Sequence, residues 1–166
     1  VVYGVFGFKT HAKLLMLVRR EDQGLRRYVH LGTGNYHQDT TRSYTDFGLL
    51  TCNEEIGQDV AEVFKQLTGL GKASTLTHLW QAPFALQKNV VAAINAEAEI
   101  ARAGRRGHIM AKMNALLEPE TIEALYAASQ AGVHIELIVH GPCALRPGVA
   151  GLSENIRGRS VVGRFL

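Results

Sequence analysis

The amino-acid sequence predicts an α/β protein organised as two domains, and three observations carry this prediction. Extended apolar segments separated by a turn occupy the first fifty residues. Apolar residues then recur at helical spacing from Asn53 to Leu67. A strand, helix, strand order marked out by Pro and Gly follows in the second half. Residues 68–77 are rich in Gly, Lys, Ser and Thr, the composition of a loop, so we expect domains over residues 1–77 and 78–166.

The first half is expected to hold three strands and one helix. Strands are predicted at residues 1–8, where apolar residues alternate with Gly, at the apolar run 13–18, and at 26–30. The polar tetrapeptide Glu21-Asp22-Gln23-Gly24 predicts a hairpin turn between the last two. The segment from Asn53 to Leu67 alternates an apolar stripe with acidic residues and predicts an amphipathic helix.

The second half is expected to form an α/β unit. A helix is predicted at residues 86–103, a strand with its exit loop at 108–117, a helix at 119–131 with Pro in its first turn, and a buried strand at 133–139. Gly132 ends the second of these helices. A helix between two strands predicts a crossover connection, which joins parallel neighbours.

Composition excludes several classes of protein. A net charge of +3 is too small to indicate a nucleic-acid partner, although two basic ends flank an acidic middle. No apolar run approaches the roughly 20 residues of a membrane span, so no transmembrane segment is expected. Two distant cysteines argue against a disulfide framework and favour a reducing, cytoplasmic location. The abrupt start without Met predicts a piece of a longer protein.

The segment Lys9-Thr10-His11-Ala12-Lys13 holds the first candidate site residues. On a strand, His11 and Lys13 point to the same face. A neutral imidazole is a nucleophile, and a neighbouring ammonium neutralises charge that develops on phosphoryl oxygens. The pattern is therefore typical of a phosphohistidine intermediate. A pair of residues that simply faces solvent at a strand end is the alternative.

A glycine-rich turn follows the third predicted strand. In His30-Leu31-Gly32-Thr33-Gly34-Asn35-Tyr36, two glycines allow backbone N–H groups to approach an anion, and Asn35 adds a side-chain donor. An ordinary turn after a strand is the alternative. The combined order of His11, Lys13 and Asn35 resembles the half-site of the phospholipase D superfamily, in which histidine attacks phosphorus. The hydrolases of that superfamily carry an acid five residues after the lysine, where this chain has Val18.

Longer stretches are similar to one family, bacterial polyphosphate kinase. They are residues 9–13, 26–36, 44–51 and 152–157. The resemblance implies two phospholipase D-like α/β domains, each incomplete in this fragment. It also implies reversible transfer of the terminal phosphate of ATP to inorganic polyphosphate through a phosphohistidine, with ATP, ADP and polyphosphate as partners and Mg²⁺ as cofactor. A homo-oligomer in the cytoplasm, able to associate with the membrane as a full-length complex, is the expected state.

Residue roles are carried over from that resemblance. His11 is implied as the phosphorylated nucleophile, with Lys13 and Asn35 on the phosphoryl oxygens and Tyr44 on the nucleotide. Lys112 and Asn114, which we place on one face of a strand, are expected to bind phosphate. His140 stands where the family has an ATP-binding arginine. The second catalytic histidine and the Mg²⁺ ligands are expected outside the chain, which predicts an inactive fragment without metal ligands.

The remaining charged and histidine residues have simpler interpretations. Six arginines are candidates for the path of the polyanion: Arg102, Arg105, Arg106, Arg157, Arg159 and Arg164. The histidines at 30, 37, 78, 108 and 134 have no mutual sequence spacing that suits a metal. Two other functions remain open, a phosphodiesterase or nuclease of the same superfamily and a non-catalytic module that binds polyanions. Val18, at the position where the hydrolases carry an acid, argues against the phosphodiesterase or nuclease.

Overall fold

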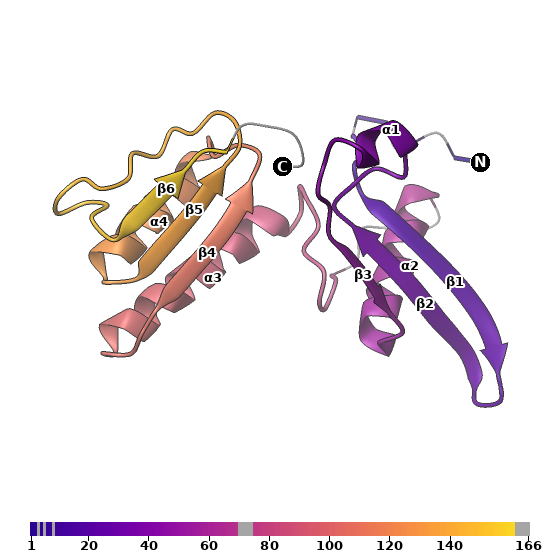
Figure 1. The fold of residues 1–166 in the computed structure, drawn as a ribbon. Coiled ribbons are helices and arrows are strands. Elements are labelled where there is room, and N and C mark those ends of the chain that lie inside the picture. The colour runs from indigo at the N-terminus through magenta and orange to yellow at the C-terminus, as the bar shows by residue number, and fades with distance from the viewer. Residues whose placement is uncertain (3, 5, 8, 70–74, 162–166) are drawn as a thin grey trace. The chain divides into compact units, whose positions relative to one another are not determined.

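The chain divides into two compact units, the first from Val1 to Trp80 and the second from Gln81 onwards (Figure 1). A computed structural model describes residues 1–161 except 3, 5, 8 and 70–74. Each unit holds a three-stranded sheet and helices, so the α/β prediction is confirmed. In the described part of the chain, no helix combines the length and the apolar character needed to cross a membrane.

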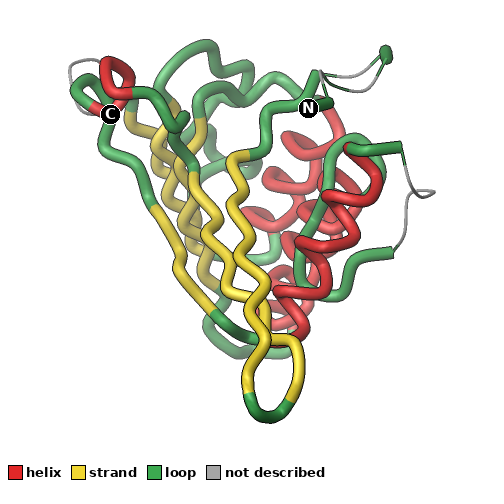
Figure 2. Tube along the Cα trace, turned by 90° about the vertical axis from the view of Figure 1, so that its right-hand side faces the viewer, coloured by secondary structure: helices red, strands yellow, loops and turns green. Residues whose placement is uncertain are grey.

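The first unit is built on an antiparallel sheet in the order β1-β2-β3. Its strands are β1 (Lys13–Glu21), β2 (Gly24–Gly32) and β3 (Gly48–Thr51). The predicted hairpin turn is confirmed, because Glu21 pairs with Gly24 across a two-residue turn and Gly24 has a φ of +121°. Figure 2 shows β1 and β2 as a long ribbon that ends in this short turn.

Helix α2 (Glu54–Leu67) covers one face of this sheet. Val60 and Val63 of the helix and Val29 of β2 are buried. The register puts Leu14, Met16 and Leu31 on that same helix-facing side. The opposite face carries Lys13, Leu15 and His30, and Leu15 is 54% exposed there.

Three features of the first unit differ from the sequence-based expectation. The described residues of 1–8 form no strand, because Gly4 and Gly7 have φ values of +115° and +81°, and residues 3, 5 and 8 lie outside the described part. Strand β3 and the short helix α1 (Gln38–Thr41) were not predicted. Both are too short for a periodic pattern to develop.

The second unit is built on a parallel sheet in the order β4-β5-β6. Its elements are α3 (Leu86–Arg102), β4 (His108–Met113), α4 (Pro119–Gln130), β5 (His134–Val139) and β6 (Ile156–Arg159). The predicted crossover is confirmed, because β4 and β5 are parallel and α4 lies between them in sequence. Strand β6 was not predicted, since its sequence Ile-Arg-Gly-Arg has a single apolar residue.

One face of the second sheet packs against helices and the other is open. The hydrophobic core joins β5 to α3 and α4, with Ile135 and Leu137 almost fully buried. Figure 1 shows both helices behind this sheet. Alternate residues of β4 therefore point away from the helices, and His108, Met110 and Lys112 are exposed. The prediction that Asn114 shares this strand is wrong, because β4 ends at Met113 and Asn114 lies in the bend that follows.

Candidate active site

The first candidate site lies at the start of β1. The Lys13 Nζ atom is 3.0 Å from the Nδ1 atom of His11 and 3.1 Å from its Nε2 atom. A lysine ammonium has only hydrogens to donate, so in this contact Lys13 is the donor. The contact brings together the two side chains that the sequence predicts as nucleophile and charge-neutralising partner.

His30 lies on the same open face and was not predicted as part of a site. It pairs with Leu15 of β1 and with Leu50 of β3. A methyl group on Gly48 would lie 2.6 Å from the His30 Nε2 atom, so the absence of a side chain at Gly48 makes room for the imidazole. The His30 Nδ1 atom lies 2.6 Å from the Tyr36 hydroxyl oxygen. The sequence feature that could have indicated this position of His30 is the pair of glycines Gly32 and Gly48, which are opposite each other in the pairing of β2 with β3.

The glycine-rich turn after β2 is held by the chain itself. The Thr33 hydroxyl donates to the Asp46 Oδ1 atom at 3.2 Å, and the Thr33 N–H donates to the Phe47 carbonyl oxygen at 3.0 Å. A Cβ atom on Gly34 would lie 2.0 Å from the Asp46 Oδ2 atom, so the carboxylate occupies the space that a side chain would fill. Gly34 is therefore required for packing against Asp46. The negatively charged carboxylate of Asp46 occupies the place where the sequence predicted that an anion would bind.

Asn35 and Tyr44 lie near this turn, in loops rather than in strands. Asn35 follows the turn and is exposed, and Tyr44 lies between α1 and β3 with 49% of its surface exposed. In the described part of the chain, neither side chain forms a hydrogen bond with His11 or Lys13. Within the first unit, the structure thus joins His11 to Lys13 and leaves Asn35 and Tyr44 accessible on their loops.

The second unit places its candidate residues where β4 and β5 end. The Gly141 N–H donates to the Asn114 carbonyl oxygen at 2.7 Å, and the His140 N–H donates to the Met113 carbonyl oxygen at 3.0 Å. Asn114 and His140 therefore lie side by side at the carboxyl ends of parallel strands, the edge at which α/β sheets bind ligands. Lys112 precedes them on the open face of β4.

The ring of His140 has a defined hydrogen-bonding state. Its Nδ1 atom lies 2.9 Å from the Val161 carbonyl oxygen. Because a carbonyl only accepts, Nδ1 carries the hydrogen and donates it. In the neutral ring, Nε2 is then an acceptor and cannot donate to a phosphate. An arginine at this position would offer several donors at every pH.

The open face also gathers basic residues into one row. Lys112 of β4 pairs with Ile138 of β5, which pairs with Arg159 of β6. Adjacent strands lie about 4.8 Å apart, so the Cα atoms of Lys112 and Arg159 lie about 10 Å from each other.

Three of the other predicted arginines lie at the end of α3 rather than in the sheet. Arg102, Arg105 and Arg106 are exposed at and beyond the end of α3, and Arg102 is paired with Glu99. Arg164 lies outside the described residues.

Within the described residues, one group of three side chains could share an ion: His108, His134 and Glu136. Mg²⁺ prefers six oxygen ligands, and this group offers two nitrogens and one carboxylate. The sequence spacing of these histidines predicted no metal site. Pairing of β4 with β5 nevertheless places His108 beside His134, 26 positions later in the chain.

Comparisons with known proteins agree over both units. A family model described as polyphosphate kinase C-terminal domain 1 matches residues 1–73, and one described as polyphosphate kinase C-terminal domain 2 matches residues 79–166. The polyphosphate kinases of Burkholderia vietnamiensis and Neisseria gonorrhoeae are 62% and 61% identical to the whole chain, which covers 25% and 24% of their lengths.

A solved structure gives the same similarity in three dimensions. The crystal structure of polyphosphate kinase from Porphyromonas gingivalis matches 99% of the chain with a TM-score of 0.86 and 35% sequence identity. The match covers 27% of that protein. The chain therefore spans about a quarter of the length of the relatives that it matches.

Proposed function

The chain belongs to the polyphosphate kinase family, and from that premise we propose that it forms part of a site that transfers the terminal phosphate of ATP to inorganic polyphosphate. The transfer is reversible and passes through a phosphorylated His11. The observation that carries this proposal is the contact of the Lys13 Nζ atom with both ring nitrogens of His11, at 3.0 and 3.1 Å, at the exposed start of β1.

The chemistry follows from that contact. The unprotonated nitrogen of His11 attacks the terminal phosphorus of ATP, the bond from that phosphorus to the bridging oxygen breaks, and ADP leaves with the electron pair. A terminal oxygen of polyphosphate then attacks the phosphohistidine, and the nitrogen–phosphorus bond returns its electrons to His11. The Lys13 ammonium moves its donors from the imidazole to the phosphoryl oxygens, where negative charge builds up in the transition state.

Residues of the second unit extend the proposal to the substrates. Lys112 and Asn114 bind phosphate, supported by the row of Lys112, Ile138 and Arg159 across the open face. His140 is assigned to nucleotide binding in this unit, and Tyr44 is assigned to nucleotide binding in the first unit. We assign residues 1–77 to the end of one catalytic domain and residues 78–166 to the start of a second. Because the chain spans about a quarter of its relatives, we propose that it needs the rest of the protein for activity, including the Mg²⁺ ligands, in a cytoplasmic homo-oligomer.

Labelling by ATP tests the role of His11. The protein that carries this chain is incubated with ATP labelled in its terminal phosphate, and acid-labile, base-stable label on protein is measured. We expect label on the wild type and none on His11→Ala, which should also lose ATP-dependent polymer growth and the reverse reaction. His37→Ala, an exposed histidine beside α1, is the matched control and should keep both signals.

Persistent histidine label in His11→Ala would contradict this assignment. The same preparations distinguish the other function classes. Cleavage of a phosphodiester by the wild type, without label from ATP, would indicate a phosphodiesterase or nuclease. Salt-sensitive binding of polyphosphate without either reaction would indicate a binding module.

A further inference from the structure

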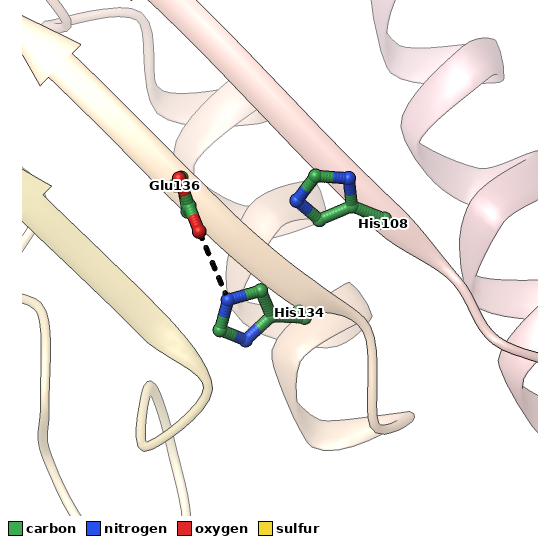
Figure 3. Close-up of side chains that lie close together, drawn as sticks. All are labelled: His108, His134 and Glu136. Atoms are coloured by element: carbon green, nitrogen blue, oxygen red, sulfur yellow. Dashed lines mark hydrogen bonds and ion pairs between the residues drawn. The ribbon is translucent and has the colours of Figure 1, made fainter.

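Three side chains on the open face of the second sheet form a cluster that the proposed phosphotransfer does not use. His108 begins β4, His134 begins β5, and Glu136 lies two residues further along β5 on the same face. Figure 3 shows the three side chains gathered together, with the dashed line joining His134 to Glu136. One ligand atom from each, two imidazole nitrogens and one carboxylate oxygen, lies within 4.8 Å of the others. We propose that His108, His134 and Glu136 form a binding site for a divalent transition metal, Zn²⁺ above all.

The spacing of the ligand atoms fits a tetrahedral ion. Zinc bonds to His and Glu are about 2.0–2.2 Å long, which separates two ligands of one tetrahedral ion by about 3.3 Å. The His134 Nε2 atom and the Glu136 Oε1 atom are already 3.2 Å apart. The exposed His108 ring needs a side-chain rotation to bring its nitrogen to the same distance. Two imidazoles and one carboxylate form a known zinc donor set, with water in the fourth position.

The backbone holds both histidines in place. The His108 N–H donates to the Glu97 Oε2 atom at 3.0 Å, and the His134 N–H donates to the Gly107 carbonyl oxygen at 3.1 Å. The two rings are nearly parallel, with centroids 5.6 Å apart and planes inclined by 16°. A metal ion binds imidazole in its neutral form. Two rings this close can share one ion without a change in the backbone.

Arg157 is the charged neighbour that opposes a cation here. It lies beside Glu136 in the register of β5 and β6. Within the described part of the chain, Arg157 and Glu136 form no ion pair, and Arg157 is exposed. The Glu136 carboxylate contacts His134 instead, with its Oε1 atom 3.2 Å from the His134 Nε2 atom. At this position it can bind an ion.

The site lies at the opposite edge of the sheet from the candidate nucleotide residues. His108 and His134 begin their strands, whereas Asn114 and His140 follow the strand ends. Six residue steps along a strand separate these edges by about 20 Å. An ion at this position does not contact phosphate bound at Asn114 or His140. It links β4 to β5, and its expected effect is to stabilise the second unit.

Metal titration of the protein that carries this chain tests the proposal. The protein is stripped with a chelator and titrated with Zn²⁺ by calorimetry, and with Co²⁺, whose intense visible bands report four-coordination. The variants are His108→Ala and Glu136→Gln. The matched control is His78→Ala, because His78 and Glu55 form another histidine–carboxylate pair, 2.5 Å apart, that belongs to no three-ligand group within the described residues.

We expect the wild type and His78→Ala to bind Zn²⁺ at this site with equal affinity. Each cluster variant should bind it at least about 10²-fold more weakly, because loss of a direct ligand exceeds the roughly 10- to 100-fold effect of removing a group that only hydrogen-bonds to a ligand. Zn²⁺ should raise the melting temperature of the wild type and not that of either variant. Equal affinity and equal Co²⁺ bands in wild type and Glu136→Gln, an exposed and nearly isosteric change, would overturn the proposal.

Discussion

At the scale of single residues, the contact between His11 and Lys13 is the feature on which the proposed chemistry depends. Both side chains are accessible at the start of β1, and the ammonium lies within hydrogen-bonding distance of both ring nitrogens. In the proposed transfer, a lysine in this position neutralises the phosphoryl oxygens as the new bond forms.

Lys13→Met should lower kcat by about 10²-fold or more, because it removes charge stabilisation that operates in the transition state. The apparent KM for ATP should change far less. Steady-state kinetics of the protein that carries this chain measure both constants. Lys9→Met is the matched control, an exposed lysine two residues before His11. If kcat of Lys13→Met equals that of the control, Lys13 has no part in the reaction.

His140→Arg should lower the apparent KM for ATP by about 5- to 30-fold, equivalent to about 1–2 kcal/mol for a charge-assisted hydrogen bond. In the neutral ring, Nδ1 donates to the Val161 carbonyl oxygen and Nε2 has no hydrogen to give. An arginine at this position offers several donors to a phosphate.

His140→Gln separates charge from hydrogen bonding in this test, since it adds a neutral donor. It should not reproduce the gain. Equal KM values for wild type and His140→Arg at pH 8 would remove His140 from the nucleotide site.

At the scale of elements, α2 is the helix that covers the sheet of the candidate site. It begins where Asn53 accepts the Ile56 N–H at 2.9 Å, with Glu54 and Glu55 in the first turn. Acidic residues there interact favourably with the positive end of the helix dipole. Its apolar face then packs on β2, so that His30 and Lys13 are left on the other side of the sheet.

Asn53→Ala should lower the free energy of unfolding by about 1 kcal/mol, the usual cost of losing an N-cap. Asn53→Asp keeps an acceptor at the same place and should stay close to the wild type. Urea denaturation followed by circular dichroism measures the difference. Equal stability of Asn53→Ala and Asn53→Asp would show that the cap contributes nothing to the stability of this unit.

At the scale of the whole molecule, each unit exposes one sheet face and packs helices on the other. The first unit also ties down the segment that leads into the second. Asp59 of α2 is 3% exposed and accepts the N–H groups of Thr77, His78 and Leu79 at 3.0, 2.6 and 2.9 Å. A buried carboxylate with three donors makes the position of residues 77–79 depend on ionisation of Asp59.

Stability should therefore fall in acid. Burial alone would raise the pKa of Asp59, but the three backbone donors outweigh it and hold that pKa below its ordinary value of 3.8. A group with a lowered folded-state pKa stabilises the fold fully above the unfolded value and loses this effect as pH falls through the folded value. The free energy of unfolding should thus decrease below about pH 4.

Asp59→Asn identifies the source of this dependence. The variant should be less stable than the wild type at pH 7, and the difference should narrow as the pH falls towards 3, because the unfolded carboxyl group binds a proton before the folded one does. Asp39→Asn, which changes an exposed carboxylate of α1, is the control and should follow the wild type. A difference that is constant between pH 7 and pH 3 would contradict the assignment to ionisation.

Local signals in the sequence were sufficient for much of this structure. The tetrapeptide Glu21 to Gly24 predicted the hairpin, helical spacing predicted α2, α3 and α4, and Gly132 marked the end of α4. Long motifs indicated the family, which the comparisons confirm. The contact of His11 with Lys13 was expected from their separation of two residues, but the prediction that both lie on one strand is wrong, because β1 begins at Lys13 and His11 precedes it. Each of these features depends on residues that are close in sequence.

Other features depend on residues far apart in sequence, and only the tertiary structure decided them. Packing of α2 determined which face of the first sheet stayed open and so brought His30 beside Gly48. Asp46 filled the space at Gly34, and strand pairing brought His108 beside His134. Backbone register and side-chain packing are settled when separate segments meet, and periodicity along one segment carries no information about its partner.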